Sequence, residues 1–251
     1  DERAVDPLMK VAADKELALE HKLAAVQQLA FLGSTKAIPD LMTLLTKEVN
    51  QYDPVSQGFR VQVALAIANL LDGSDEKTMA KFQKAIDDIK KGLDAWIADN
   101  NEKIGKVEKP ELKQALAQDI KGYEEQKGNF GEVEAKLAVV RECKADVACL
   151  AGKLEAKEDA IRLLAAYRLA QTKGDAVPAA RDALVKVAGT EDLVLRNVVF
   201  FGLDRLGDAS IIPAMEKIRA ADDARAEKDK RYKGAVYTTD LLIAKLKHKK
   251  G

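Results

Sequence analysis

Apolar residues recur along this chain three or four positions apart, the spacing of one face of an α-helix. Two segments show the pattern clearly: Leu19, Leu23, Val26 and Ala30, then Leu195, Val198, Val199, Leu203 and Leu206. Alternating runs of Val, Ile or Thr between turn residues, which would predict strands, do not occur over any useful length. Aromatic residues make up only 5% of the chain, and Ala, Leu, Lys, Asp and Glu dominate, which favours helices. The pattern predicts an all-α protein.

One sequence pattern occurs several times. Its copies lie at 22–42, 60–73, 161–180 and 195–215. When the last two are aligned at an offset of about 34 residues, Arg162 falls on Arg196 and Pro178 falls on Pro213. The copy at 60–73 keeps the helix but lacks the proline that follows. Repetition at this period is typical of proteins built from stacked supersecondary units.

Each copy has the same internal order: a helical segment, a glycine or short polar turn, and a second helical segment. The turn glycines, which suit a left-handed helix C-cap, are Gly33, Gly73, Gly174 and Gly207. Proline is tolerated in the first turn of the second helix because the N–H that it lacks would have no intrahelical partner there. The repeated unit is therefore expected to be a helical hairpin.

Two of the copies carry a specific resemblance. The segments "LRNVVFFGLDRLGDASIIPAM" at 195–215 and "LAAVQQLAFLGSTKAIPDLM" at 23–42 are similar to HEAT repeats of the short bacterial type, which also occur in phycobilisome lyases. Repeats of that type combine a helix of "VRxxAAxALGxLGD" character with "AIPxL". The resemblance covers 1–98 and 146–225 well, and it implies an α-solenoid of antiparallel helix pairs.

An irregular central segment is expected to interrupt the solenoid. The stretch "ADNNEKIGKVEKPELK" at 98–113 contains Asn100, Asn101, Gly105 and Pro110, all of which disfavour a continuous helix. We therefore expect HEAT-like helix pairs at 1–98, an irregular helical junction at 99–145 with charged helices at 110–127 and 132–143, and further HEAT-like pairs at 146–251. The alternative for the central segment is an elongated repeat.

The charge balance excludes some classes of partner. The chain has 41 basic and 41 acidic residues, so no global field attracts it to nucleic acid or to an anionic membrane. No apolar run approaches the roughly 20 residues that span a bilayer. The basic C-terminal stretch "AKLKHKKG" is expected to be a frayed tail.

The two cysteines, Cys143 and Cys149, lie at the end of this central segment. Their spacing is not the C-x-x-C of redox motifs, and a structural zinc site needs four Cys or His ligands. In an unbroken helix their Cα atoms would lie about 9 Å apart, beyond the roughly 7 Å limit for a disulfide. Asp146 is a good N-cap, which predicts a turn at 144–145. We expect a disulfide, with two buried reduced thiols as the alternative.

The state of the cysteines bears on location. A disulfide predicts a periplasmic or otherwise exported protein, whereas reduced thiols would fit the cytoplasm. The first residues, "DERAVDPLMK", are too charged for a secretory signal peptide. Because the chain begins at Asp1, any targeting information is expected to lie outside this sequence.

Signatures of catalysis are lacking. The sequence contains no G-x-S-x-G, Walker loop or dinucleotide fingerprint. His21 and His248 are far apart in sequence and are expected to be ordinary helix and tail residues. We therefore expect no catalytic residues, no metal site and no cofactor.

Three arginines recur near the start of one helix of the pair: Arg60, Arg162 and Arg196. In HEAT-like repeats an arginine at this position bonds acidic or carbonyl groups between repeats, so the resemblance implies a structural role, with partner recognition as the alternative. Trp96, the only tryptophan, is expected to be a core anchor.

The leading hypothesis for function is a non-enzymatic scaffold or adaptor, because a stack of helix pairs offers an extended surface for a protein or peptide partner. One alternative is nucleic-acid binding, as in helical-repeat DNA glycosylases. That activity would need a concentrated basic face, whereas Lys and Arg are interleaved here with Asp and Glu. Another alternative is a bilin-lyase-like enzyme, which rests on the analogy of repeats alone. The sequence does not identify the partner-binding residues.

Overall fold

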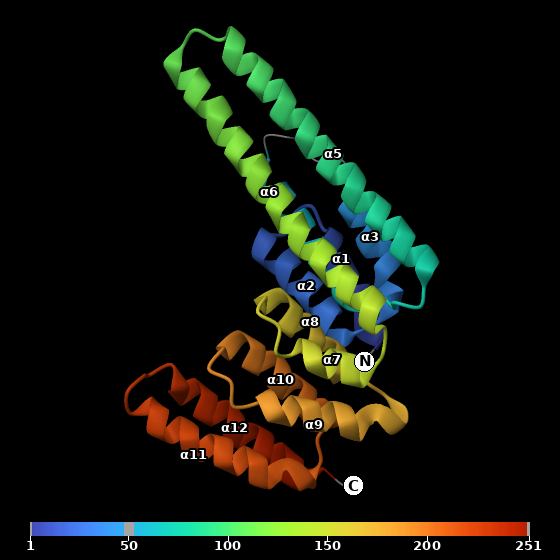
Figure 1. The fold of residues 1–251 in the computed structure, drawn as a ribbon, viewed down its shortest axis with the longest axis vertical. Coiled ribbons are helices and arrows are strands. Elements are labelled where there is room, and N and C mark those ends of the chain that lie inside the picture. Colours follow the sequence, from blue (N-terminus) through green and yellow to red (C-terminus); the bar gives the residue numbers. More distant parts are fainter. Residues whose placement is uncertain (1, 48–52, 250–251) are drawn as a thin grey trace. The chain divides into compact units, whose positions relative to one another are not determined.

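The computed structural model describes residues 2–47 and 53–249. In this part of the chain the regular structure consists of α-helices and short 3₁₀ turns, without strands (Figure 1). The chain forms two compact units, 1–144 and 145–251. The expected all-α fold is confirmed.

The first unit consists of three helical hairpins. Its helices are α1 (Val5–Ala13), α2 (Leu19–Leu32), α3 (Ile38–Thr46), α4 (Pro54–Leu70), α5 (Glu76–Lys106) and α6 (Pro110–Cys143). Each odd-numbered helix packs against the even-numbered helix that follows it. In addition, α4 packs between α2 and α6, and α3 contacts both α1 and α5. The hairpins therefore stack in two layers.

The second unit repeats this plan. Its helices are α7 (Val147–Lys153), α8 (Asp159–Ala170), α9 (Val177–Val187), α10 (Leu193–Leu206), α11 (Ile212–Ala226) and α12 (Tyr232–His248). Here α10 packs between α8 and α12, and α7 contacts α9. The helices α3, α9 and α11 each follow a 3₁₀ turn and carry a proline at the first or second helical position. The order expected from the repeated pattern is thus present in both units.

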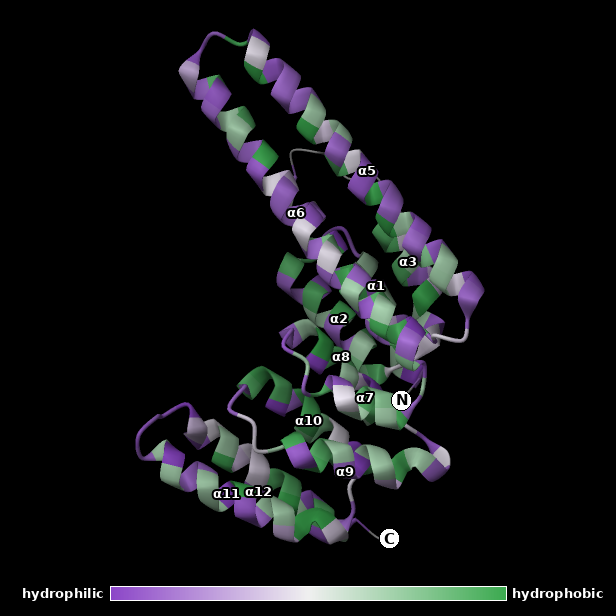
Figure 2. Ribbon diagram, viewed as in Figure 1, coloured by the Kyte–Doolittle hydropathy of each residue, from purple (hydrophilic) through white to green (hydrophobic). Residues whose placement is uncertain are grey.

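The region expected to be an irregular junction differs from that expectation. Helix α5 continues through Asn100 and Gly105 to Lys106, and α6 runs without a break from 110 to 143. The two helices form a long antiparallel hairpin (Figure 1). Figure 2 shows mostly hydrophilic residues in the part of this hairpin near the loop between α5 and α6. Residues 99–144 therefore belong to an elongated hairpin of the first unit.

Packing between α5 and α6 explains why the helices continue. Trp96 and Tyr123 face each other across the hairpin with their ring centroids 5.5 Å apart. Asn100 and Phe130 are buried. A glycine inside a helix costs only about 1 kcal/mol relative to alanine, and aromatic burial across a hairpin offsets that cost. Trp96 is half-buried at this contact, in keeping with a core anchor.

The four turn glycines fall into two pairs that differ in backbone conformation. Gly33 and Gly174 have φ of 67° and 68°, so both are left-handed. Gly33 is the expected C-cap of α2, whereas Gly174 begins the 3₁₀ turn before α9. Gly207 is extended, with φ −74° and ψ 156°, and Gly73 also lacks a positive φ. For these two glycines the left-handed expectation is wrong. A Cβ atom would lie 2.2 Å from the Val140 carbonyl oxygen at Gly73, and 2.4 Å from the Leu203 carbonyl oxygen at Gly207.

We predict that Gly73→Ala lowers the free energy of unfolding of the first unit by about 1–3 kcal/mol, because the methyl group displaces α6. Gly131→Ala is the matched control, since a Cβ atom there meets nothing within 4 Å. In the control, removal of a helical glycine should stabilise the unit by about 0.5–1 kcal/mol. Urea unfolding followed by the fluorescence of Trp96 reports on this unit. Equal stability of the two variants would contradict the prediction.

Candidate functional site

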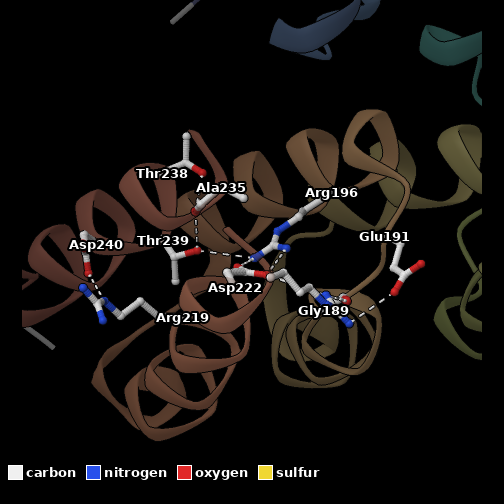
Figure 3. A network of polar contacts seen from close by, with 10 residues as sticks. Gly189, Glu191, Arg196, Arg219, Asp222, Ala235, Thr238, Thr239 and Asp240 are labelled. Carbon is white, nitrogen blue, oxygen red and sulfur yellow. Dashed lines mark hydrogen bonds and ion pairs between the residues drawn. The ribbon is translucent and has the colours of Figure 1, made fainter. Parts of the chain in front are cut away.

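Arg196, one of the three repeated arginines, forms a buried ion pair in the second unit. Its Nη1 donates to Oδ1 of Asp222 on α11 at 2.9 Å, and its Nη2 donates to Oδ2 of the same carboxylate. A weaker contact of 3.5 Å joins Nη2 to the Thr239 hydroxyl on α12 (Figure 3). The guanidinium also lies 5.0 Å from the ring centroid of Phe200. Arg196 is only 2% exposed, so this arginine fastens α10 to the last hairpin.

Neighbouring charges extend the network around this pair. Arg225 lies 3.7 Å from Asp222 and 3.5 Å from Glu191, and it stacks 5.4 Å from the ring centroid of Tyr232. Arg219 donates from Nε to Asp240 at 2.9 Å, as Figure 3 shows. Each of these cations therefore has a carboxylate partner within the unit.

Arg162 is the second repeated arginine whose charge is balanced by carboxylates. Its Nη1 donates to the carbonyl oxygens of Ala156 and Lys157 at 2.9 and 3.0 Å, and its Nη2 donates to Asp159 at 2.5 Å. It also reaches Asp192 at 3.3 Å, and Asp192 caps the N-terminus of α10. Arg162 therefore joins its own hairpin to the next.

Arg60, on α4 in the first unit, is different. Its Nη2 donates to the Lys47 carbonyl oxygen at 2.6 Å, and no carboxylate in the described part of the chain pairs with it. Its Nε is buried without a hydrogen-bond partner. The same holds for Nε of Arg196, but there Asp222 neutralises the guanidinium. Burial lowers the pKa of Arg60. Among the described residues, Arg60 is thus a partly buried cation that no carboxylate pairs with.

Arg60 lines a cavity of about 300 Å³ between the ends of the first four helices. The other cationic side chains of the lining are Lys15, Lys22 and Lys47. The remaining lining residues are apolar apart from one serine: Ala12, Ala13, Leu17, Leu19, Leu44, Val55, Ser56 and Phe59. Leu17 and Val55 are 37% and 54% exposed. None of the lining residues that the structure describes is acidic. We call this cavity the Arg60 recess.

The N-terminus of α4 beside this recess already carries an anion. The Asp53 carboxylate accepts hydrogen bonds from the N–H groups of Val55 and Ser56, both at 3.1 Å, and from the Ser56 hydroxyl at 2.5 Å. The bond from the Ser56 hydroxyl, followed by that from its N–H, lowers the pKa of Asp53. Asp53 therefore satisfies the helix end.

A second recess adjoins Arg60 on the side of α5. It has a volume of about 320 Å³, and its lining includes Trp96 and Asp88. Asp88 bonds to Lys84 at 2.5 Å. The acidic residue of this second lining is therefore paired with a lysine of its own helix.

The cysteines lie where the turn at 144–145 predicts. Cys143 ends α6 and Cys149 belongs to α7, and the two are disulfide-bonded. The Asp146 carboxylate accepts the N–H of Cys149 at 2.8 Å, which is the expected N-cap. Lys144 turns the chain with a φ of 49°. The disulfide closes a short loop at a helix joint.

The C-terminal stretch is not the frayed tail expected from its composition. Helix α12 extends to His248, and Lys245 pairs with Asp204 at 2.6 Å. The Lys249 ammonium donates to the carbonyl oxygens of Gly207 at 3.0 Å and of Asp204. A cation at these carbonyls caps the C-terminus of α10. Lys245 and Lys249 therefore have structural partners, while residues 250–251 lie outside the described part of the chain.

None of the described helices combines the length and apolarity required to cross a membrane. No protein-family model matches the chain, and no curated protein matches it.

Two crystal structures of engineered proteins from a structural genomics consortium are similar to the chain at low level. The first is 15% identical, with a TM-score of 0.32 and 96% of both chains covered. The second is 16% identical, also with a TM-score of 0.32, and the match covers 96% of this chain and 68% of that one. Likeness this weak assigns neither a family nor an activity.

For the buried pair, we predict that Asp222→Ala lowers the free energy of unfolding by about 3–5 kcal/mol, because it leaves the Arg196 charge buried and unpaired. The double variant Arg196→Met/Asp222→Leu should recover most of this loss, since it removes both charges. Urea unfolding followed by far-UV circular dichroism measures both effects. If the single variant were as stable as the unaltered protein, the pair would not stabilise the second unit.

Proposed function

We propose that this protein is a non-enzymatic scaffold that binds a protein or peptide partner on the surface of its helix pairs. The observation that carries the proposal is the Arg60 recess, which combines an apolar lining with four cations. Arg162 and Arg196 bond carboxylates within the second unit, whereas Arg60 keeps N–H donors that can bond a partner. Stacked helix pairs hold such a recess rigidly and require no chemistry for this role.

The repeats and the location belong to the same proposal. A 3₁₀ turn followed by a proline-started helix supports an assignment to HEAT-like repeats of the short bacterial type. The disulfide between Cys143 and Cys149 supports an oxidising location, and in a bacterium that is the periplasm. Nucleic-acid binding is less well supported, because phosphate chains need a long basic track. The four cations of the Arg60 recess surround one small cavity and do not form such a track.

Photocrosslinking tests the proposal. A photoreactive amino acid replaces Val55, which is 54% exposed at the recess, or Leu112, which is 51% exposed on α6 as a matched control. After irradiation in the native compartment, we expect one discrete adduct from position 55 that is lost when Lys15 and Lys22 are changed to Glu. Identical adducts from both positions, or none from either, would contradict a partner site at the recess.

A further inference from the structure

The positive charges in the Arg60 recess indicate the sign of the charge on its ligand. Arg60 bonds only a backbone carbonyl, and the side chains of Lys15, Lys22 and Lys47 form no ion pair within the described structure. Four cations around one cavity repel one another, and the partly buried Arg60 also loses hydration. An anion in the cavity relieves both effects. The ligand is therefore negatively charged.

The remaining donors favour a carboxylate. A guanidinium carries five N–H donors in a planar fork that matches the two oxygens of a carboxylate or phosphate. One donor of Arg60 is used on Lys47. Phosphate sites in proteins commonly add the N–H groups of a helix N-terminus, but at α4 Asp53 already occupies those groups. The donor group that remains for a ligand is therefore the guanidinium of Arg60, which lies beside apolar side chains.

The apolar part of the lining specifies what the carboxylate is attached to. Leu19, Leu44 and Phe59 are half-buried in the recess, and Leu17 and Val55 are exposed beside it. A volume of about 300 Å³ lies at the lower end of the range for small-ligand pockets. The recess therefore accepts a small apolar group, and it is too small for a whole helix.

The C-terminal residue of a peptide meets both requirements at once. Its α-carboxylate and its side chain share one Cα atom, so the charge and the apolar group enter a small recess together. An internal Asp or Glu would bring two flanking peptide groups onto apolar side chains that cannot bond them, which is unfavourable. Capture of a chain terminus is an established mode of peptide recognition.

We propose that the Arg60 recess binds the free C-terminal carboxylate of a partner whose last residue is apolar. Arg60 holds the carboxylate, the three lysines supply attraction, and Leu19, Leu44 and Phe59 contact the terminal side chain. This assignment rests on the proposed function and names the part of the partner that is recognised.

The test uses the whole chain and two dye-labelled peptides of sequence Gly-Ser-Gly-Ser-Ala-Leu, one with a free C-terminal acid and one amidated. Fluorescence anisotropy at low salt measures their affinities. We expect the acid to bind more tightly than the amide by about tenfold or more, and Arg60→Gln to abolish that difference. Lys106→Gln, on the far part of α5, should leave the difference unchanged because Lys106 pairs with Glu102 on its own helix. Urea unfolding of Arg60→Gln, followed by Trp96 fluorescence, establishes that the variant folds.

Several results would overturn the inference. Equal affinity for acid and amide excludes recognition of the terminal carboxylate. Unchanged binding by a folded Arg60→Gln variant excludes Arg60 as its ligand. Displacement of the peptide by octanoate at concentrations below the dissociation constant of the peptide assigns the recess to small amphiphilic acids instead.

The inference and the proposed function fail in different ways. A partner crosslinked at position 55 whose binding survives removal or amidation of its C-terminus supports the scaffold and overturns the terminal recognition. Tight, Arg60-dependent binding of the acid peptide, together with no crosslinked partner in the native compartment, supports the ligand chemistry and contradicts the scaffold.

Discussion

The structure depends on one packing constraint, which is that a helical hairpin cannot bury its apolar sides alone. Helix α4 has to be covered by α2 and α6 as well as by its own partner α3, and α10 has the same need for α8 and α12. Because the neighbours supply this cover, the surfaces between hairpins are specified closely. Gly73 lies against α6, and Gly202 lies against Leu184 and Ala170. Stability is thus distributed along each unit as contacts between neighbours, as in other repeat architectures.

The repeated arginines show how one position in such a stack serves different ends. Arg196 and Arg162 reach carboxylates of the following hairpin, so their charge fastens neighbours together. Arg60 occupies the corresponding place on α4, but among the described residues it bonds a backbone carbonyl and no carboxylate. Its charge is therefore directed at a recess with three lysines. A repeated arginine that bonds no acid among the described residues is therefore a candidate binding position.

The sequence was sufficient for the features that arise from local signals. Helical periodicity, the prolines that start helices, the left-handed Gly33 and the Asp146 cap with its disulfide all follow from residues close together in the chain. Features that depend on distant contacts were not predictable in this way. Asn100 and Gly105 read as helix breakers, but contact of α5 with α6 keeps the helix intact. The recess combines residues from four helices, and Lys249 reaches carbonyl groups of α10.

The uncompensated charge of Arg60 is most directly tested by nuclear magnetic resonance of the arginine Nε–H groups in the whole protein. Arg162 and Arg196 serve as internal references, since their guanidinium groups already bond carboxylates. During titration with the acid peptide, the Arg60 Nε–H resonance should shift, while those of Arg162 and Arg196 remain in place. An unchanged Arg60 resonance, or equal shifts of all three, would contradict a binding role for this arginine.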